Sequence, residues 1–277
     1  MIEDSKTSLK SAPEGKLQGT PLAGQHALVT GATRGIGAAI ADTLGRLGAD
    51  LTLIGRDSES LHERAVKLAA DYRVKIHAEA ADVVDEEAIT EAFNNAAAAN
   101  GMVSVLVNNA GSGKSAPFHK MGRELWDSMI AVNLTGTFNC TRAALPAMLK
   151  AGDGRIINIA STAGLIGYSY VSAYCAAKHA VVGMTRSLAL ETAKKGVTVN
   201  AVCPGYTETD LVRDTIGNIV EKTGRSIEDA TAELAASNPQ ERLVQPWEVA
   251  ETVGWLALPA SASITGQSIP VAGGEVM

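Results

Sequence analysis

Short apolar runs alternate along the chain with longer segments in which apolar residues recur at helical spacing. A short run of apolar, often β-branched residues is typical of a buried strand, whereas an apolar residue at every third or fourth position is typical of a helix. Strands are expected at residues 26–30, 50–54, 74–80, 103–107, 155–159, 197–203 and 268–271. Helices are expected from the glycines after the first strand to residue 47, and at about 58–72, 86–100, 122–149, 172–195, 211–223, 227–236 and 246–258. The alternation predicts an α/β fold, with one doubly wound parallel sheet of about seven strands and helices on both faces.

Polar segments delimit this unit. Residues 1–22 contain Ser, Lys, Glu, Gly and Pro without apolar periodicity, and we expect them to form a flexible tail. No repeat, linker or charge run divides residues 23–277, so we expect a single domain. The connection at about 206–245 is longer and more polar than the others, which is typical of a lid over the carboxyl edge of a sheet.

A glycine turn follows the first expected strand and reads Gly31-Ala-Thr-Arg-Gly35-Ile-Gly37. Glycines let backbone N–H groups approach a pyrophosphate closely, and the following helix supplies its positive N-terminal end. The turn therefore predicts a dinucleotide site. Its spacing differs from the Gly-x-Gly-x-x-Gly fingerprint, so a simple structural turn is the alternative interpretation.

The ends of the second and third expected strands indicate which dinucleotide binds. An acidic residue after the second strand would favour NAD(H), whereas Arg56, helped by Arg34, suits the 2′-phosphate of NADP(H). We therefore favour NADP(H) over NAD(H), the alternative being two solvated surface arginines. Asp82 lies at the carboxyl end of the third strand, where it can contact the adenine.

Tyr174 and Lys178 lie four residues apart in an expected helix and so share one face. A neighbouring ammonium favours the phenolate, so we expect the pKa of Tyr174 to fall from about 10 toward neutrality, as suits a general acid or base. Two solvated neighbours are the alternative. Ser161 follows the fifth strand and approaches the same sheet edge, and Asn133 is a polar residue among apolar ones, which a structural hydrogen bond alone could explain.

Several other classes of protein are disfavoured. The chain has no Gly-x-Ser-x-Gly elbow, and the segment 111–115 lacks the first glycine of a nucleotide-triphosphate loop, so neither an acyl-transfer triad nor that loop is expected. Cys140, Cys175 and Cys203 are widely spaced, which disfavours a metal site and indicates buried thiols in a reducing compartment. A net charge of -6 argues against nucleic acid or a membrane surface as partner. With no apolar stretch long enough to span a membrane, a cytoplasmic location is expected.

Taken together, these motifs resemble the classical short-chain dehydrogenase/reductase family. The matching residues follow in order: TGATRGIG at 30–37, Asp82, NNAG at 108–111, Asn133, Ser161, Tyr174, Lys178 and Pro204-Gly205. The resemblance covers about residues 22–277, and no position of the family's catalytic tetrad departs from the pattern. It implies a Rossmann-type fold and an NAD(P)-dependent oxidoreductase that reduces a ketone to a secondary alcohol, or performs the reverse reaction.

The resemblance also implies a role for each site residue. Tyr174 would donate a proton to the substrate's carbonyl oxygen, Ser161 would orient that carbonyl, Lys178 would hold the nicotinamide ribose and lower the pKa of the tyrosine, and Asn133 would support a water relay. Thr207 and Thr209 would fix the carboxamide. The expected cofactor-binding residues are Gly31, Thr33, Arg34, Gly35, Ile36, Gly37, Arg56, Asp82, Val83, Asn109, Ala110, Gly111, Tyr174, Lys178, Pro204, Gly205, Thr207 and Thr209. Family members of this length are usually homotetramers, with the helices near 122–149 and 172–195 packed between subunits.

Within the family, residues 197–212 and the C-terminal stretch look most like 3-oxoacyl-thioester reductases and polyketide ketoreductases, with D-3-hydroxybutyrate dehydrogenases as the alternative. The latter surround a free carboxylate with polar and basic side chains, and the corresponding positions here are Gly113, Ala163 and Val171. A buried carboxylate without partners is costly, so we expect a CoA or acyl-carrier thioester or a plain ketone as substrate. A non-catalytic dinucleotide sensor or partner subunit is a different class, but such proteins typically lack the tyrosine or the lysine.

Overall fold

The computed structural model describes residues 19–277; of Leu211, Asn218 and Lys222 it describes the backbone alone. Most of the predicted tail, residues 1–18, lies outside the described residues. Its predicted end is wrong, because Leu22 is fully buried in the core and its N–H donates a 2.9 Å hydrogen bond to the carbonyl of Leu47. An apolar side chain removed from water in this way stabilises the fold, so the domain includes residue 22.

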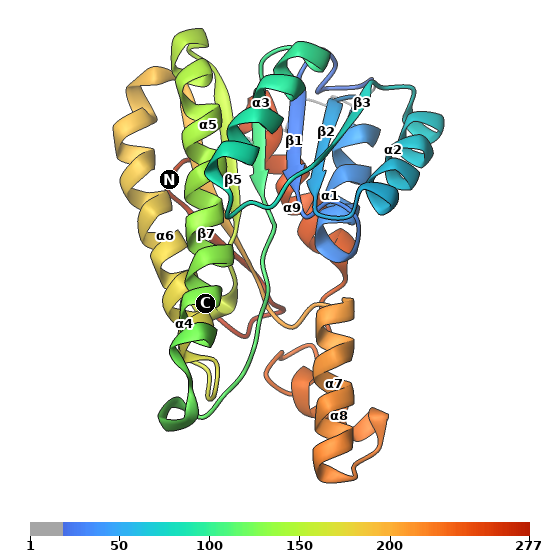
Figure 1. Cartoon of the computed structure of the whole chain (residues 1–277), viewed down its shortest axis with the longest axis vertical. Coiled ribbons are helices and arrows are strands. Elements are labelled where there is room, and N and C mark those ends of the chain that lie inside the picture. Colours follow the sequence, from blue (N-terminus) through green and yellow to red (C-terminus); the bar gives the residue numbers. More distant parts are fainter. Residues whose placement is uncertain (1–18) are drawn as a thin grey trace, which may run out of the picture.

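A single sheet of seven parallel strands forms the middle layer (Figure 1), in the order β3-β2-β1-β4-β5-β6-β7. The strands are β1 (His26–Thr30), β2 (Asp50–Gly55), β3 (Ile76–Ala80), β4 (Val105–Asn108), β5 (Gly154–Ile159), β6 (Val197–Pro204) and β7 (Ser268–Val271). From β1 the chain first adds β2 and β3 on one side and then returns to add β4 to β7 on the other side. The gap between β1 and β4 is therefore a topological switch point, where ligands bind in open α/β sheets. The predicted doubly wound sheet is confirmed.

Helices cover both faces of this sheet (Figure 1). One face carries α1 (Gly35–Arg46), α2 (Ser58–Tyr72) and α9 (Pro246–Ala257), and the other carries α3 (Glu86–Asn100), α5 (Gly136–Ala151) and α6 (Ser172–Thr192). Successive strand residues point to opposite faces of the sheet. Val29 and Leu53 pack with α1 and α2, whereas Leu28 and Ile54 pack with α3 and α5. Burial on both faces explains why the central strands are mostly apolar rather than alternating, whereas the edge strand β3 is only partly buried.

The helix predicted at 122–149 is not regular. It consists of α4 (Arg123–Ile130), a π turn over Ala131–Thr135, and α5. Asn133 lies fully buried within the π turn, where its amide nitrogen donates to the carbonyl of Met129 at 3.0 Å and to the carbonyl of Ser112 at 2.9 Å. Such a turn contains one residue more than the α-helical path, and a shift of one position in the apolar spacing is too small to mark the turn in the sequence.

The N-cap of α2 is Asp57, whose carboxylate accepts the N–H of Ser60 at 3.0 Å. The polar connection folds into α7 (Asp210–Thr223) and α8 (Ile227–Ala235), which pack on each other around a small core of their own and stand apart from the sheet layers (Figure 1). Among residues 19–277, no helix combines the length and apolarity that a bilayer crossing requires.

Candidate active site

The glycine turn between β1 and α1 is shaped for a close backbone approach. Gly31 and Gly35 have φ angles of +64° and +55°, in the left-handed region that favours glycine. A Cβ on Gly37 would lie 2.1 Å from the carbonyl oxygen of Gly31, so no other residue fits there. The first turn of α1 has no side-chain cap and no acidic residue, so its N–H groups are available to a phosphate. The turn therefore fits the predicted dinucleotide.

Thr30, at the end of β1, connects the glycine turn to the segment that follows β4. Its hydroxyl oxygen accepts the backbone N–H groups of Asn109 at 3.0 Å and Ala110 at 2.9 Å. The amide of Asn109 in turn donates to the carbonyls of Thr30 and Gly31, at 2.9 and 3.1 Å. Asn109 and Ala110 were expected at the site, whereas Thr30 was expected only as the first residue of the TGATRGIG motif, with no indication that its hydroxyl holds two backbone N–H groups.

The two arginines predicted to select NADP(H) are both exposed. Neither guanidinium makes an ion pair within residues 19–277. A Cβ on Gly55 would lie 3.6 Å from the side chain of Thr33, so the end of β2, with Arg56, adjoins the glycine turn, with Arg34. The predicted adenine contacts lie at the end of β3, where Asp82 accepts the N–H of Val84 at 3.1 Å.

The segment after β6 also reaches the glycine turn. A Cβ on Gly35 would lie 3.2 Å from the methyl group of Thr209, which precedes α7. The hydroxyl of Thr209 donates to the carbonyl of Thr207 at 3.2 Å, and that of Thr207 donates to the carbonyl of Gly205 at 3.0 Å. Pro204 ends β6, so all the predicted cofactor residues on this segment lie at the carboxyl edge.

The four predicted catalytic residues are brought together from three elements. Ser161 follows β5, and its hydroxyl lies close enough to the phenol of Tyr174 on α6 to lower the pKa of that phenol. The ammonium of Lys178 lies 5.6 Å from the centroid of the Tyr174 ring and donates to the carbonyl of Ile159 at 2.8 Å. A Cβ on Gly111 would lie 2.7 Å from Oδ1 of Asn133 and 3.7 Å from Nζ of Lys178, so the end of the NNAG motif lies between these two side chains.

The protonation energetics differ from the prediction. Burial raises the pKa of Tyr174 to about 12, although the hydrogen bond to Ser161 opposes this rise. Burial also lowers the pKa of Lys178 to about 8. The expectation that Lys178 draws the pKa of Tyr174 toward neutrality is therefore wrong for the protein without ligand. The reason is that both groups are desolvated and the ammonium is directed at the carbonyl of Ile159.

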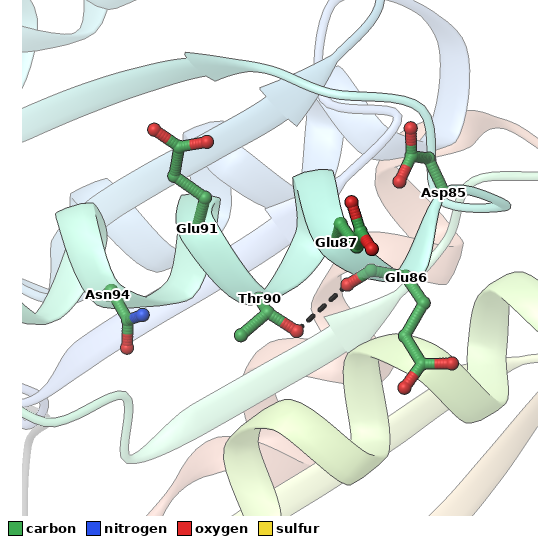
Figure 2. A pocket seen from close by; sticks show the side chains of 6 residues that line it. All are labelled: Asp85, Glu86, Glu87, Thr90, Glu91 and Asn94. Carbon is green, nitrogen blue, oxygen red and sulfur yellow. Dashed lines mark hydrogen bonds between the residues drawn. The ribbon is translucent and has the colours of Figure 1, made fainter.

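A hollow elsewhere on the surface is lined by Asp85, Glu86, Glu87, Thr90, Glu91 and Asn94, all at the N-terminal part of α3 (Figure 2). Figure 2 shows these side chains along the first turns of the helix, and Glu86 also makes an ion pair with Arg142 of α5. It includes no predicted site residue, and its negative charge is unsuited to the phosphates of a dinucleotide. Among residues 19–277 no cluster of three or more His, Cys, Asp or Glu is arranged to hold a metal ion.

Comparisons with known proteins agree with this geometry. A family model described as short chain dehydrogenase matches residues 25–218. A Streptomyces coelicolor protein named as a ketoacyl reductase is 42% identical over 253 residues, which cover 90% of this chain and 95% of that protein. A D-beta-hydroxybutyrate dehydrogenase from Cupriavidus necator is 39% identical over 257 residues, covering 92% of this chain and 99% of the enzyme. A crystal structure of a variant of actinorhodin polyketide ketoreductase with NADPH has a TM-score of 0.87 at 39% identity, over 93% of this chain and 98% of that one.

The matched region contains the glycine turn and the four predicted catalytic residues, Asn133, Ser161, Tyr174 and Lys178. Fold, motif order and relatives all indicate one family. The chain belongs to the short-chain dehydrogenase/reductase family and is an oxidoreductase that binds a nicotinamide dinucleotide.

Proposed function

We propose that the enzyme reduces the ketone of a 3-oxoacyl thioester or a similar uncharged ketone to a secondary alcohol, or performs the reverse reaction, with Tyr174 as general acid or base. The observation that carries the proposal is the contact between Ser161 and Tyr174 at the sheet edge, beside the buried ammonium of Lys178. A reduced nicotinamide, when bound, supplies the hydride. The protein's own task is to hold the carbonyl and to deliver the proton.

The side chains divide this task. The phenol of Tyr174 donates its proton to the carbonyl oxygen, which the Ser161 hydroxyl holds in place by a second hydrogen bond. Lys178 gives one N–H to the carbonyl of Ile159, which leaves two donors of its ammonium for the nicotinamide ribose. Asn133 holds the loop at Ser112 through both atoms of its amide, and so keeps the NNAG segment at the site.

The proton step is tested with Tyr174→Phe, which removes the phenolic proton and keeps the ring. Turnover should fall by about a hundredfold or more, while NADPH binding, followed by fluorescence, stays nearly unchanged. Tyr170→Phe is the matched control, because this exposed tyrosine is outside the contacts described above. Unchanged turnover in Tyr174→Phe would remove this residue from the mechanism. Tight NADPH binding by the unmodified protein without turnover of any ketone would favour the non-catalytic alternative.

NADP(H) is the preferred cofactor in this proposal. Arg34 lies within the glycine turn and Arg56 lies close to it, and neither guanidinium has an ion-pair partner among residues 19–277. The carboxylate next to Arg56 in the sequence, that of Asp57, is engaged in capping α2. Two guanidinium groups can pair with a 2′-phosphate, whereas NADH offers them only hydroxyls.

Arg56→Asp tests the cofactor proposal. Replacing a donor to phosphate with a carboxylate should lower kcat/KM for NADPH by about 10- to 100-fold, and shift the preference toward NADH. Lys67→Asp makes the same charge change on the exposed side of α2 and should leave the ratio unchanged. An unchanged ratio in Arg56→Asp would mean that the phosphate is held elsewhere.

The substrate is proposed to be uncharged near the reacting carbon. Gly113, Ala163 and Val171 carry no charge, and Ala163 is buried directly after the loop that carries Ser161. A free carboxylate would be desolvated there without a partner. The names of the ketoacyl reductase relatives support this class, and those of the D-beta-hydroxybutyrate dehydrogenases name the alternative. A panel of acetoacetyl-CoA, a longer 3-oxoacyl thioester, acetoacetate and simple ketones tests it, and a preference for acetoacetate would overturn it.

Two further predictions complete the proposal. Residues 206–245 act as a lid, because α7 and α8 carry their own small core and connect to the site through the contact between Thr209 and Gly35. A homotetramer is supported by large apolar side chains exposed on the outer helices, Phe138 on α5 and Leu190 on α6. The cytoplasmic location stays a prediction from the sequence.

A further inference from the structure

The turn after β7 directs one carboxylate back to the carboxyl edge of the sheet. Gly273 and Gly274 have φ angles of +62° and +100°, and the N–H of Glu275 donates to the carbonyl of Ala272 at 3.1 Å. A Cβ on Gly273 would lie 1.9 Å from the amide oxygen of Asn238, so the turn is packed tightly against the segment before α9. This tight packing fixes where Glu275 leaves the turn.

Glu275 ends beside β6 at the level of the site. Its Oε2 lies 2.8 Å from the position that a Cβ on Gly205 would take. Its Oε1 accepts a 2.6 Å hydrogen bond from the phenol of Tyr168. The phenol oxygen also lies 2.8 Å from the hydroxyl of Thr162, and because a phenol has one proton, Thr162 is the donor in that second bond. A carboxylate held by a short charge-assisted bond keeps a defined position.

Glu275 is connected to the catalytic residues by a short chain of contacts. Thr162, which supports Tyr168, directly follows the catalytic Ser161. The ring of Tyr168 meets that of Tyr206 edge to face, with centroids 6.2 Å apart. Burial is the main cause that raises the pKa of Tyr206, and the charge of Glu275 is the next. The pKa of Tyr174 is raised mainly by its own burial, and Tyr206 is close enough to add to this rise.

No cation compensates this charge. Within residues 19–277, no Lys, Arg or His side chain lies within ion-pairing distance of Glu275. The lysine of the site, Lys178, is directed at the carbonyl of Ile159. A second carboxylate entering the site would therefore meet a partly buried negative charge that no cation balances, and like charges repel.

We propose that Glu275, held in place by Tyr168, is a specificity residue that excludes free 3-oxo acids and 3-hydroxy acids from the site and leaves it open to their esters and thioesters. The inference rests on the proposed ketone reduction and extends it, because it adds an element of repulsion to a site that already lacks a cation for a carboxylate. It predicts that the ratio between acid and ester substrates depends on this one charge.

The experiment compares two substrates with the same carbon frame, acetoacetate and its uncharged methyl ester, under NADPH oxidation. Glu275→Gln keeps the size of the side chain and an acceptor for Tyr168 but removes the charge. The ratio of kcat/KM for acetoacetate to that for methyl acetoacetate should rise about tenfold or more, mainly through KM of the acid. Glu91→Gln removes one charge from the outer face of α3 and should leave the ratio within twofold of the unmodified enzyme.

A second measurement needs no variant. Raising the salt concentration from about 20 to 500 mM screens the repulsion, so the acid-to-ester ratio of the unmodified enzyme should rise. A ratio that responds neither to Glu275→Gln nor to salt overturns the inference, although reduction of methyl acetoacetate would still support the proposed function. An enzyme that prefers acetoacetate, or that reduces neither these two compounds nor acetoacetyl-CoA, overturns both.

Discussion

Replacing Lys178 should make the ligand-free protein more stable while it removes activity. Burial lowers the pKa of this lysine from 10.5 to about 8, so at pH 7.5 the folded state still holds a charge that the interior disfavours. At about 1.36 kcal/mol per pKa unit, the penalty is about 3 kcal/mol. Lys178→Met fills the same space with an apolar chain, but gives up a hydrogen bond to the carbonyl of Ile159 that is worth about 1–2 kcal/mol. The expected net gain at pH 7.5 is about 1–2 kcal/mol.

The pH dependence gives the sharper test. A lysine with a lowered folded-state pKa binds fewer protons in the folded than in the unfolded chain between about pH 8 and 10.5, so the stability of the unmodified protein rises with pH across this window. Lys178→Met lacks the titrating ammonium, so its stability does not show this rise with pH. Its advantage should therefore shrink by about 2 kcal/mol between pH 7.5 and 9.5.

Urea unfolding at these two pH values, at one protein concentration, measures the stability gain of Lys178→Met at pH 7.5 and its decrease at pH 9.5. Lys67→Met, which removes an exposed lysine from α2, is the control and should show a stability difference that is the same at both pH values. A difference for Lys178→Met that does not change with pH would refute the reasoning, as would a loss of more than about 2 kcal/mol at pH 7.5.

Two further substitutions test the glycine turn and the buried amide of Asn133. Gly37→Ala places a Cβ 2.1 Å from the carbonyl of Gly31, so NADPH affinity should fall at least about tenfold in a fluorescence titration, whereas Gly217→Ala, with open space around it, should leave the affinity unchanged. Asn133→Ala removes a fully buried amide that makes three hydrogen bonds, and urea unfolding should show a loss of about 2–4 kcal/mol. The exposed Asn94→Ala should change stability by less than about 0.5 kcal/mol, and an equal loss in both variants would contradict the role of the buried amide.

Much of the fold could be predicted because parallel strands covered on both faces are apolar throughout. The runs around Leu28 and Leu106 show this clearly, and both strands were expected within a few residues of their true ends. The site followed from the same logic, since residues at the carboxyl ends of parallel strands meet at one edge. Asn109, Ser161 and Tyr174 could therefore be placed together from residues far apart in sequence.

What could not be predicted depends on contacts between distant residues or on burial. The bond between Tyr168 and Glu275 joins residues 107 positions apart and leaves no local pattern. The spacing of Tyr174 and Lys178 indicates a shared face, but it reveals neither the direction of the ammonium nor the degree of desolvation, and the predicted pKa change had the wrong sign. Thr30 acts by holding two backbone N–H groups, which a single hydroxyl at a strand end does not indicate.

The π turn at Ala131–Thr135 sets the relative rotation of α4 and α5. A π turn is one residue longer than the α-helical path it replaces, and one residue corresponds to about 100° of rotation around a helix axis. Without that extra residue, the side of α4 that packs on α6 would turn away from it, although α5 kept its place on the sheet. The number of residues between the two helices is thus as much a requirement of the architecture as their identity, and shortening this segment by one position would disturb the fold more than most substitutions within it.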